Sequence, residues 1–299
     1  MDLNCSLKRI ATIHQQHSLK CYLAIRSLKR QFSWSTSDWN QIELLVSTEE
    51  PLFETTILKA NEITYDPVPR RRHWVLSHAV YPHAYFTMQQ WFQSAEPDEI
   101  FDFYLTQCLD SKQYLSHNVS ILFSFRSVWS LLSSEEQKLR FIERFCEFVT
   151  STFYGNNSLS YKLHENYIGA TEANEAIILK DCLSNPGFWG HNIIGFASIL
   201  KSKSNLSLRT FNALLLNLQE QCFWCFGDES DRPMILQNST RELSGDTLEL
   251  SCRRLLLGTS SNLHQITLAE SIVFLFQQSW VEKQEKIKLI DVLEYFAKS

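Results

Sequence analysis

Leu115-Ser116-His117-Asn118-Val119 is one of four similar stretches in this chain, and their spacing decides the fold that we predict. The others are Leu76-Ser77-His78-Ala79-Val80, Trp189-Gly190-His191-Asn192-Ile193 and, more loosely, Asn262-Leu263-His264-Gln265-Ile266. Their histidines are 39, 74 and 73 residues apart, close to one, two and two units of about 37 residues. Two helices of three or four turns with short connections fill such a unit. The repeat therefore predicts stacked helical hairpins.

The composition also indicates an all-α protein. The 299 residues include only 8 Gly and 7 Pro, too few for the turns of a many-stranded sandwich or barrel. One hairpin cannot bury both of its apolar faces, so its neighbours must stack on it. We expect one domain over residues 1–299, shaped as a curved α-solenoid or a closed α/α toroid. With 20 Phe and 8 Trp, its core should be aromatic, and the polar, aperiodic stretch 227–247 should be its longest loop.

Three sequence patterns mark expected helix starts. Ser134-Glu135-Glu136-Gln137 forms a capping box ahead of an apolar periodic run. Thr48-Glu49-Glu50-Pro51 combines a cap, an acidic first turn and a proline, which predicts another start before Leu52. Gly187 and Gly190 predict a tight entry into a helix that begins near His191.

The charge pattern excludes several partners. A net charge of −5 provides no general attraction to nucleic acid or to anionic lipid. We interpret the basic run Arg70-Arg71-Arg72 as a solvated helix start in preference to a phosphate clamp. Residues 1–20 mix charges with apolar positions, so they predict neither a signal peptide nor a membrane span. We expect a cytoplasmic protein.

The eight cysteines fit this location. Their uneven spacing, mostly within apolar helical stretches, predicts buried reduced thiols. Cys222 and Cys225 form a CxxC pair, which in other proteins binds zinc or performs redox chemistry. Because no second CxxC and no βαβ pattern accompanies it, we assign no function to this pair.

The repeated histidines allow two main interpretations. His78, His117, His191 and His264 could fasten neighbouring hairpins through hydrogen bonds, or they could face the concave side as general bases or metal ligands. Adjacent helices lie about 8–10 Å apart, so His78 and His117 could share an ion, whereas His191 and His264 could join only in a closed ring. No HxxxH or ExxH pair supports a diiron site. We therefore predict no metal ligands and favour a metal-free pocket lined by histidines.

Aromatic side chains accompany these histidines. Tyr81 and Tyr85 lie three and seven residues after His78, on one helix face, and Trp189 precedes His191. A pocket of this composition suits a flat aromatic ligand, so these three residues are candidate substrate contacts. An aromatic seam packed against a neighbouring helix is the competing explanation.

The order of several motifs resembles that of the questin oxidase-like family, over roughly residues 14–290. The motifs are, in chain order, His17-Ser18-Leu19-Lys20-Cys21-Tyr22-Leu23-Ala24-Ile25-Arg26-Ser27-Leu28, Tyr85-Phe86 through Tyr104-Leu105, His117-Asn118-Val119-Ser120-Ile121-Leu122, Pro186-Gly187-Phe188-Trp189-Gly190-His191-Asn192 and Leu263-His264-Gln265-Ile266-Thr267. The resemblance implies a Baeyer–Villiger-type oxidation of an aromatic polyketide with O₂ and NADPH. It also implies a substrate-activating role for His117 or His191, stacking by Tyr85 or Trp189, and a place for His17 at the site.

Together these patterns favour an oxidoreductase that acts on a small aromatic or polyketide-like molecule. The candidate catalytic residues are His17, His78, His117, His191 and His264. No GxGxxG follows a strand, so we predict no bound cofactor, with NADPH and O₂ as the co-substrates that the resemblance implies. The alternatives are a non-enzymatic helical-repeat module that binds a partner polypeptide and a metal-dependent enzyme whose ion is held by histidines. The sequence indicates no oligomeric state.

Overall fold

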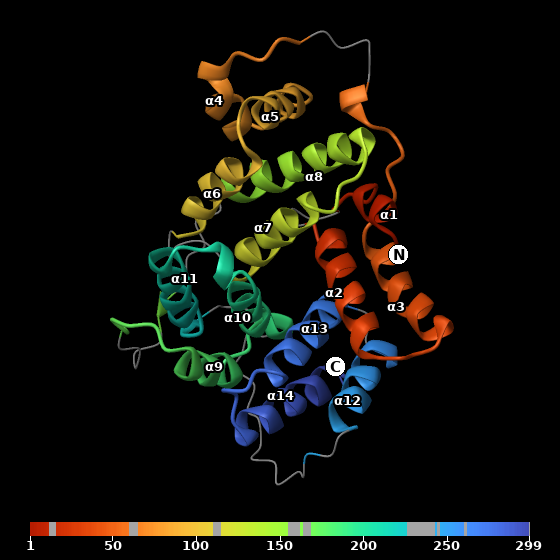
Figure 1. Ribbon diagram of the computed structural model, residues 1–299, viewed down its shortest axis with the longest axis vertical. Helices are drawn as coiled ribbons and strands as arrows, with labels where there is room; N and C mark the ends of the chain where they lie inside the picture. The colour runs from red at the N-terminus through yellow and green to blue at the C-terminus, as the bar shows by residue number, and fades with distance from the viewer. Residues whose placement is uncertain are drawn as a thin grey trace. The chain divides into compact units, whose positions relative to one another are not determined.

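The computed structural model describes residues 1–11, 16–59, 65–109, 115–154, 162–163, 169–225, 243, 246–259 and 262–298. Over these residues the regular structure is helical apart from two short strands (Figure 1), which confirms the predicted all-α class. Short 3₁₀ helices lie at η1 (Ile57–Lys59), η2 (Pro69–Arg71), η3 (Phe188–Gly190) and η4 (Lys203–Asn205). The strands β1 (Lys162–Leu163) and β2 (Trp224–Cys225) form one antiparallel pair. Whether the hairpins form a solenoid or a toroid stays a prediction.

The contacts divide the chain into two compact units. Unit 1 contains residues 1–23, 46–107 and 121–158, and unit 2 contains residues 24–45, 108–120 and 159–299. Helices α2 (Ser18–Gln31), α3 (Thr36–Glu49) and α7 (Leu115–Trp129) cross the division, and the last residue of α6 (Pro97–Cys108) lies beyond it. The other helices of unit 1 are α1 (Leu3–Leu7), α4 (Arg72–Ser77), α5 (His83–Ser94), α6 and α8 (Glu135–Phe153). The other helices of unit 2 are α9 (Glu175–Ser184), α10 (His191–Lys201), α11 (Leu208–Gln221), α12 (Thr247–Leu257), α13 (His264–Phe276) and α14 (Lys283–Phe296).

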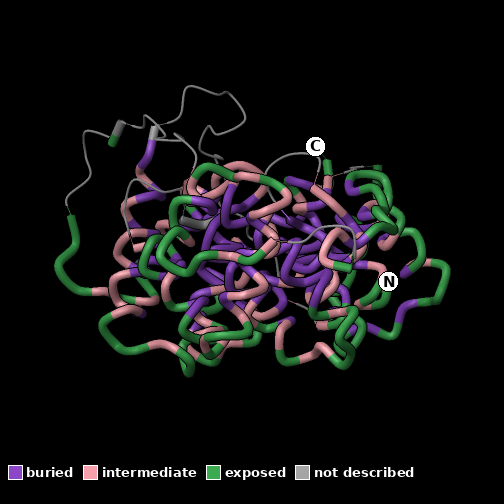
Figure 2. Tube along the Cα trace, turned by 90° about the horizontal axis from the view of Figure 1, so that it is seen from above, coloured by how far each residue is buried: buried purple, intermediate pink, exposed green. Residues whose placement is uncertain are grey.

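The core of unit 1 is aromatic, as predicted. Its fully buried rings are those of Phe101, Tyr104, Phe125, Phe141, Phe145 and Phe148. The ring of Phe145 contacts those of Phe101, Phe125 and Phe141, with centroids 5.2–6.0 Å apart. Edge-to-face and offset pairs of this kind stabilise a core beyond the area that they bury. Figure 2 shows buried and exposed stretches alternating along the chain, as amphipathic helices require.

One of the two helix starts predicted in unit 1 is confirmed and the other is wrong. Helix α8 begins at Glu135, and the Ser134 hydroxyl accepts the Gln137 N–H, as the capping box predicted. No helix starts at Thr48-Glu49-Glu50-Pro51, where α3 instead ends at Glu49. Backbone bonds from Ile10 N–H to Pro51 O and from Phe53 N–H to Lys8 O hold the following residues extended.

Unit 2 places α10 beside α13 (Figure 1), with α9 and α11 against α10 and with α12 and α14 against α13. The loop predicted over 227–247 lies outside the described residues except for Leu243, Asp246 and Thr247. Six of the cysteines with described side chains are buried, Cys5 is half-buried, and all seven are free thiols, as predicted. None of the described helices combines the length and the apolar character that a bilayer-spanning helix needs.

Candidate functional site

Three of the repeated histidines lie in the first turn of a helix in unit 2. His191 and His264 are the first residues of α10 and α13, and His117 is the third residue of α7. His117 is 1% exposed and His191 is 3% exposed, whereas His264 is half-buried. The repeated sequence position is therefore also a repeated structural position in these three helices.

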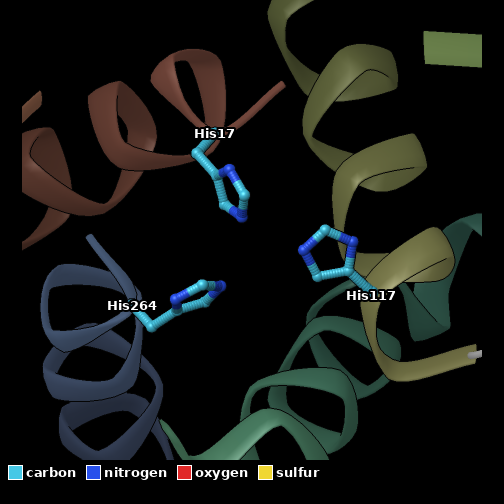
Figure 3. Close-up of side chains that lie close together, drawn as sticks. All are labelled: His17, His117 and His264. Carbon is cyan, nitrogen blue, oxygen red and sulfur yellow. The ribbon is translucent and has the colours of Figure 1, made fainter. Parts of the chain in front are cut away.

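The three imidazole rings converge. Ring centroids are 4.5 Å apart for His191 and His264, 5.2 Å for His117 and His191, and 6.2 Å for His117 and His264. A ring nitrogen of His117 lies within 4.8 Å of one of His264, and Figure 3 shows these two rings pointing toward one another from α7 and α13. We call His117, His191 and His264 the histidine cluster.

A strained turn positions His191 at the cluster. Gly187, Trp189 and Gly190 all have positive φ angles, of 70°, 47° and 74°. Glycine adopts such angles without cost, whereas Trp189 does not. The turn directs the Phe188 carbonyl oxygen back toward the helix, where it accepts a hydrogen bond from His191 Nδ1. The predicted tight glycine entry into this helix is confirmed.

A second local bond positions His264. The Asn262 Oδ1 atom accepts a hydrogen bond from the His264 backbone N–H at 2.9 Å and another from its Nδ1 at 2.6 Å. Because this oxygen can only accept a hydrogen bond, Nδ1 must carry the proton. In a neutral ring the Nε2 atom therefore has the free lone pair. The same tautomer follows for His191 from its bond to Phe188 O.

The aromatic contact of the cluster comes from Phe188. Its ring stacks on His191, with centroids 5.6 Å apart and planes at 19°, and meets the edge of His264 at 5.7 Å. The ring of Trp189, which the sequence favoured as a substrate contact, stacks instead on Phe296 at 5.0 Å. Sequence reasoning missed Phe188, although it lies in the same Gly-x-x-Gly turn.

The surroundings of the cluster favour neutral imidazoles. Three positive rings 4.5–6.2 Å apart and largely buried would repel each other strongly. Each residue also lies at the amino end of a helix, where the macrodipole disfavours positive charge. Neutral imidazoles can accept protons or bind metal ions, whereas the helix ends favour an anion beside them.

The other two candidate histidines belong to unit 1. His78 directly follows the last residue of α4, so it does not share the first-turn position, and it is exposed with its ring stacked on Trp74. His17 directly precedes α2, and its Nδ1 lies 3.5 Å from Oε1 of Glu50. The Glu50 carboxylate is only 2% exposed and accepts the backbone N–H groups of His17 and Ser18, at 2.7 and 2.9 Å.

The candidate tyrosines also lie in unit 1, around the carboxylate of Glu147. The rings of Tyr81 and Tyr85 are 4.7 Å apart, and the Tyr85 hydroxyl donates to Glu147 Oε1 at 2.7 Å. Arg144 donates to the same oxygen at 2.7 Å, and Gln16 donates to Oε2 at 3.0 Å. Tyr81 contacts Thr150 through a 2.6 Å hydrogen bond between their hydroxyl oxygens.

Burial raises the pKa of Glu147 above its ordinary value, although Arg144 and the Tyr85 hydroxyl oppose the change. The folded chain therefore holds this proton at a pH at which the unfolded chain has released it. We expect this contribution to stability to be lost as the pH rises from about 4.3 through the folded-state pKa. Chemical unfolding of wild type and Glu147→Gln across this range should show the wild type losing stability relative to the variant. Parallel pH profiles would contradict this result.

Comparison with known proteins identifies no relative. No protein-family model matches the sequence, no curated protein matches it, and no solved structure matches the fold.

Proposed function

We propose that this protein is an oxidoreductase that acts on a small aromatic or polyketide-like substrate, with the histidine cluster as its reaction centre. The observation that supports this function is the meeting of three imidazole rings from three helix starts, with centroids 4.5–6.2 Å apart, beside the Phe188 ring. Structural histidines rarely need each other, whereas reaction centres assemble titratable groups from several elements.

The chemistry proposed for the cluster begins with a substrate hydroxyl. Loss of its proton gives an electron-rich anion, which the amino ends of α7, α10 and α13 would stabilise. In the Baeyer–Villiger-type oxidation implied by the family resemblance, one oxygen atom of O₂ enters the substrate and the other leaves as water. NADPH supplies the two electrons. The ring of Phe188 offers a face on which a flat substrate can stack.

The proposal retains the finer features expected from the sequence. These are the solenoid or toroid arrangement of the hairpins, a single domain, a cytoplasmic location and co-substrates that diffuse in. The histidines could instead fasten the hairpins of a protein-interaction module. However, the Nδ1 bonds of His191 and His264 run to Phe188 and Asn262, which belong to the same local segments rather than to neighbouring hairpins.

Oxygen consumption with NADPH and a panel of hydroxylated quinones tests this function. We expect His117→Gln and His191→Gln each to lower turnover at least about 100-fold, because a positioned acid or base contributes that much or more. The matched control is His73→Gln, since His73 is exposed in unit 1. Absence of O₂ uptake with every quinone would contradict the proposal. Histidine variants that melt earlier but keep partner binding would favour the interaction module.

A further inference from the structure

The histidine cluster provides the ligand type that transition metals prefer. Neutral imidazole nitrogens bind Zn²⁺, Fe²⁺, Cu²⁺ and Ni²⁺, and three protein ligands with one open position are typical of catalytic zinc sites. The cluster contributes one imidazole from each of α7, α10 and α13, so no single helix motif reveals it in the sequence.

The separations of the rings suit one shared ion. Metal–nitrogen bonds of about 2.0–2.1 Å at tetrahedral angles place two ligand nitrogens about 3.3 Å apart and two ring centres about 5 Å apart. The observed centroid distances of 4.5, 5.2 and 6.2 Å bracket that value. Ring nitrogens of His117 and His264 lie within 4.8 Å of one another.

The Nδ1 bonds supply an independent argument. Histidines that bind metals nearly always donate their second ring N–H to a carbonyl or carboxylate oxygen, which fixes the tautomer and aims the other nitrogen. His191 donates to the Phe188 carbonyl and His264 to the Asn262 side-chain carbonyl at 2.6 Å. Two histidines from different helices thus share the outer-shell arrangement of metal ligands.

We infer that His117, His191 and His264 together bind one divalent transition-metal ion, with Asn262 and the Phe188 carbonyl as positioning groups. The inference rests on the proposed function in one respect, since both take the histidine cluster as the reaction centre. The three ligands are neutral, and three helix amino ends add positive potential, so the open position should favour an anionic oxygen. A deprotonated substrate hydroxyl is such a ligand.

Elemental analysis and cobalt spectroscopy of the full chain test the inference without any activity assay. Protein stripped with a chelator and reloaded with Zn²⁺ or Co²⁺ should retain about one ion per chain, with affinities typical of preformed sites. Cys182 and Cys222 are a competing donor pair, since their sulfur atoms lie 3.6 Å apart. Cobalt bound by thiolates shows intense sulfur-to-metal charge transfer, whereas cobalt bound by imidazoles shows only weak ligand-field bands.

Variants locate the ion. His191→Gln and His264→Gln should lower the retained metal to less than about 0.1 per chain, and His73→Gln should leave it unchanged. Asn262→Leu should weaken metal affinity about 10–100-fold while every ligand remains, and Asn262→Asp should restore it. Nitrogen NMR of the metal-free Asn262→Leu protein should also show loss of the Nδ1–H tautomer at His264. The loss of metal affinity, with recovery in Asn262→Asp, is the readout that a merely structural role would not predict.

Three results would overturn the metal site, and the first two concern the metal content. One is less than about 0.1 ion per chain on the reloaded wild type, and the other is undiminished binding in both folded histidine variants. Sulfur-to-cobalt charge transfer would likewise assign the ion to the thiols. Metal binding without O₂ uptake would instead leave this inference standing and contradict the proposed oxidation, so the two failures are distinguishable.

Discussion

Replacing Gly190 by alanine is expected to lower the free energy of unfolding by about 2–5 kcal/mol. At its φ of 74°, an L side chain costs about 1–2 kcal/mol. The new Cβ atom would also lie 2.5 Å from Cδ1 of Leu268, which is fully buried on α13 one turn after His264. Overpacking at such a position costs about 1–3 kcal/mol more. Urea unfolding monitored by circular dichroism measures the loss.

Gly190→Ala in a Leu268→Ala background is the matched control, because truncating Leu268 removes the side-chain atoms that the new Cβ would meet. The φ and ψ angles at position 190 stay the same, so we expect Gly190→Ala to cost only about 1–2 kcal/mol in that background. Equal losses in the two backgrounds would mean that backbone strain alone, and not packing against Leu268, makes glycine necessary at position 190.

Replacing Glu50 by alanine is expected to destabilise the chain by about 3–5 kcal/mol. Its carboxylate accepts the N–H groups of His17 and Ser18 at the start of α2, where no earlier carbonyl of the helix is present. Hydrogen bonds to a charged group contribute about 1.5–3 kcal/mol each, and their loss leaves two donors buried. Thermal and urea unfolding should both reveal the change.

Glu50→Gln separates the hydrogen bonds from simple loss of volume. Its amide keeps one acceptor oxygen but presents an N–H₂ group to the second backbone donor, so an intermediate loss is expected. Glu172→Ala provides the background, since Glu172 is exposed in the loop before α9. A Glu50→Ala variant as stable as Glu172→Ala would contradict this account of the helix start.

The helical class and several local features could be predicted from residue patterns because they depend on neighbours in the sequence. The capping box at Ser134 and the glycine turn before His191 are of this kind. The start predicted at Thr48 failed because Glu50 serves a different helix, α2, through bonds that span more than 30 residues. No local pattern carries such information.

The site was only partly predictable for the same reason. The repeat identified His117, His191 and His264, but only packing shows that their rings meet and that the ring of His78 is exposed. Which ring of the Phe188-Trp189 pair contacts the histidines depends on the positive φ of Trp189, which turns successive side chains in different directions. The sequence favoured Trp189 because it lies close before the repeated His191.

The way in which the chain alternates between the two units limits how the protein can be taken apart. Unit 2 is made of three separate stretches, and its boundaries fall inside α2, α3 and α7 and before the last residue of α6. Deletion of residues from either terminus therefore removes part of one unit and does not leave the other unit as a separate chain. A cut at a boundary between the units interrupts a helix. Helices resist interruption because each turn is stabilised by the next. A contiguous fragment that retains the histidine cluster should consequently not fold on its own, because unit 2 needs residues 24–45, 108–120 and 159–299 together.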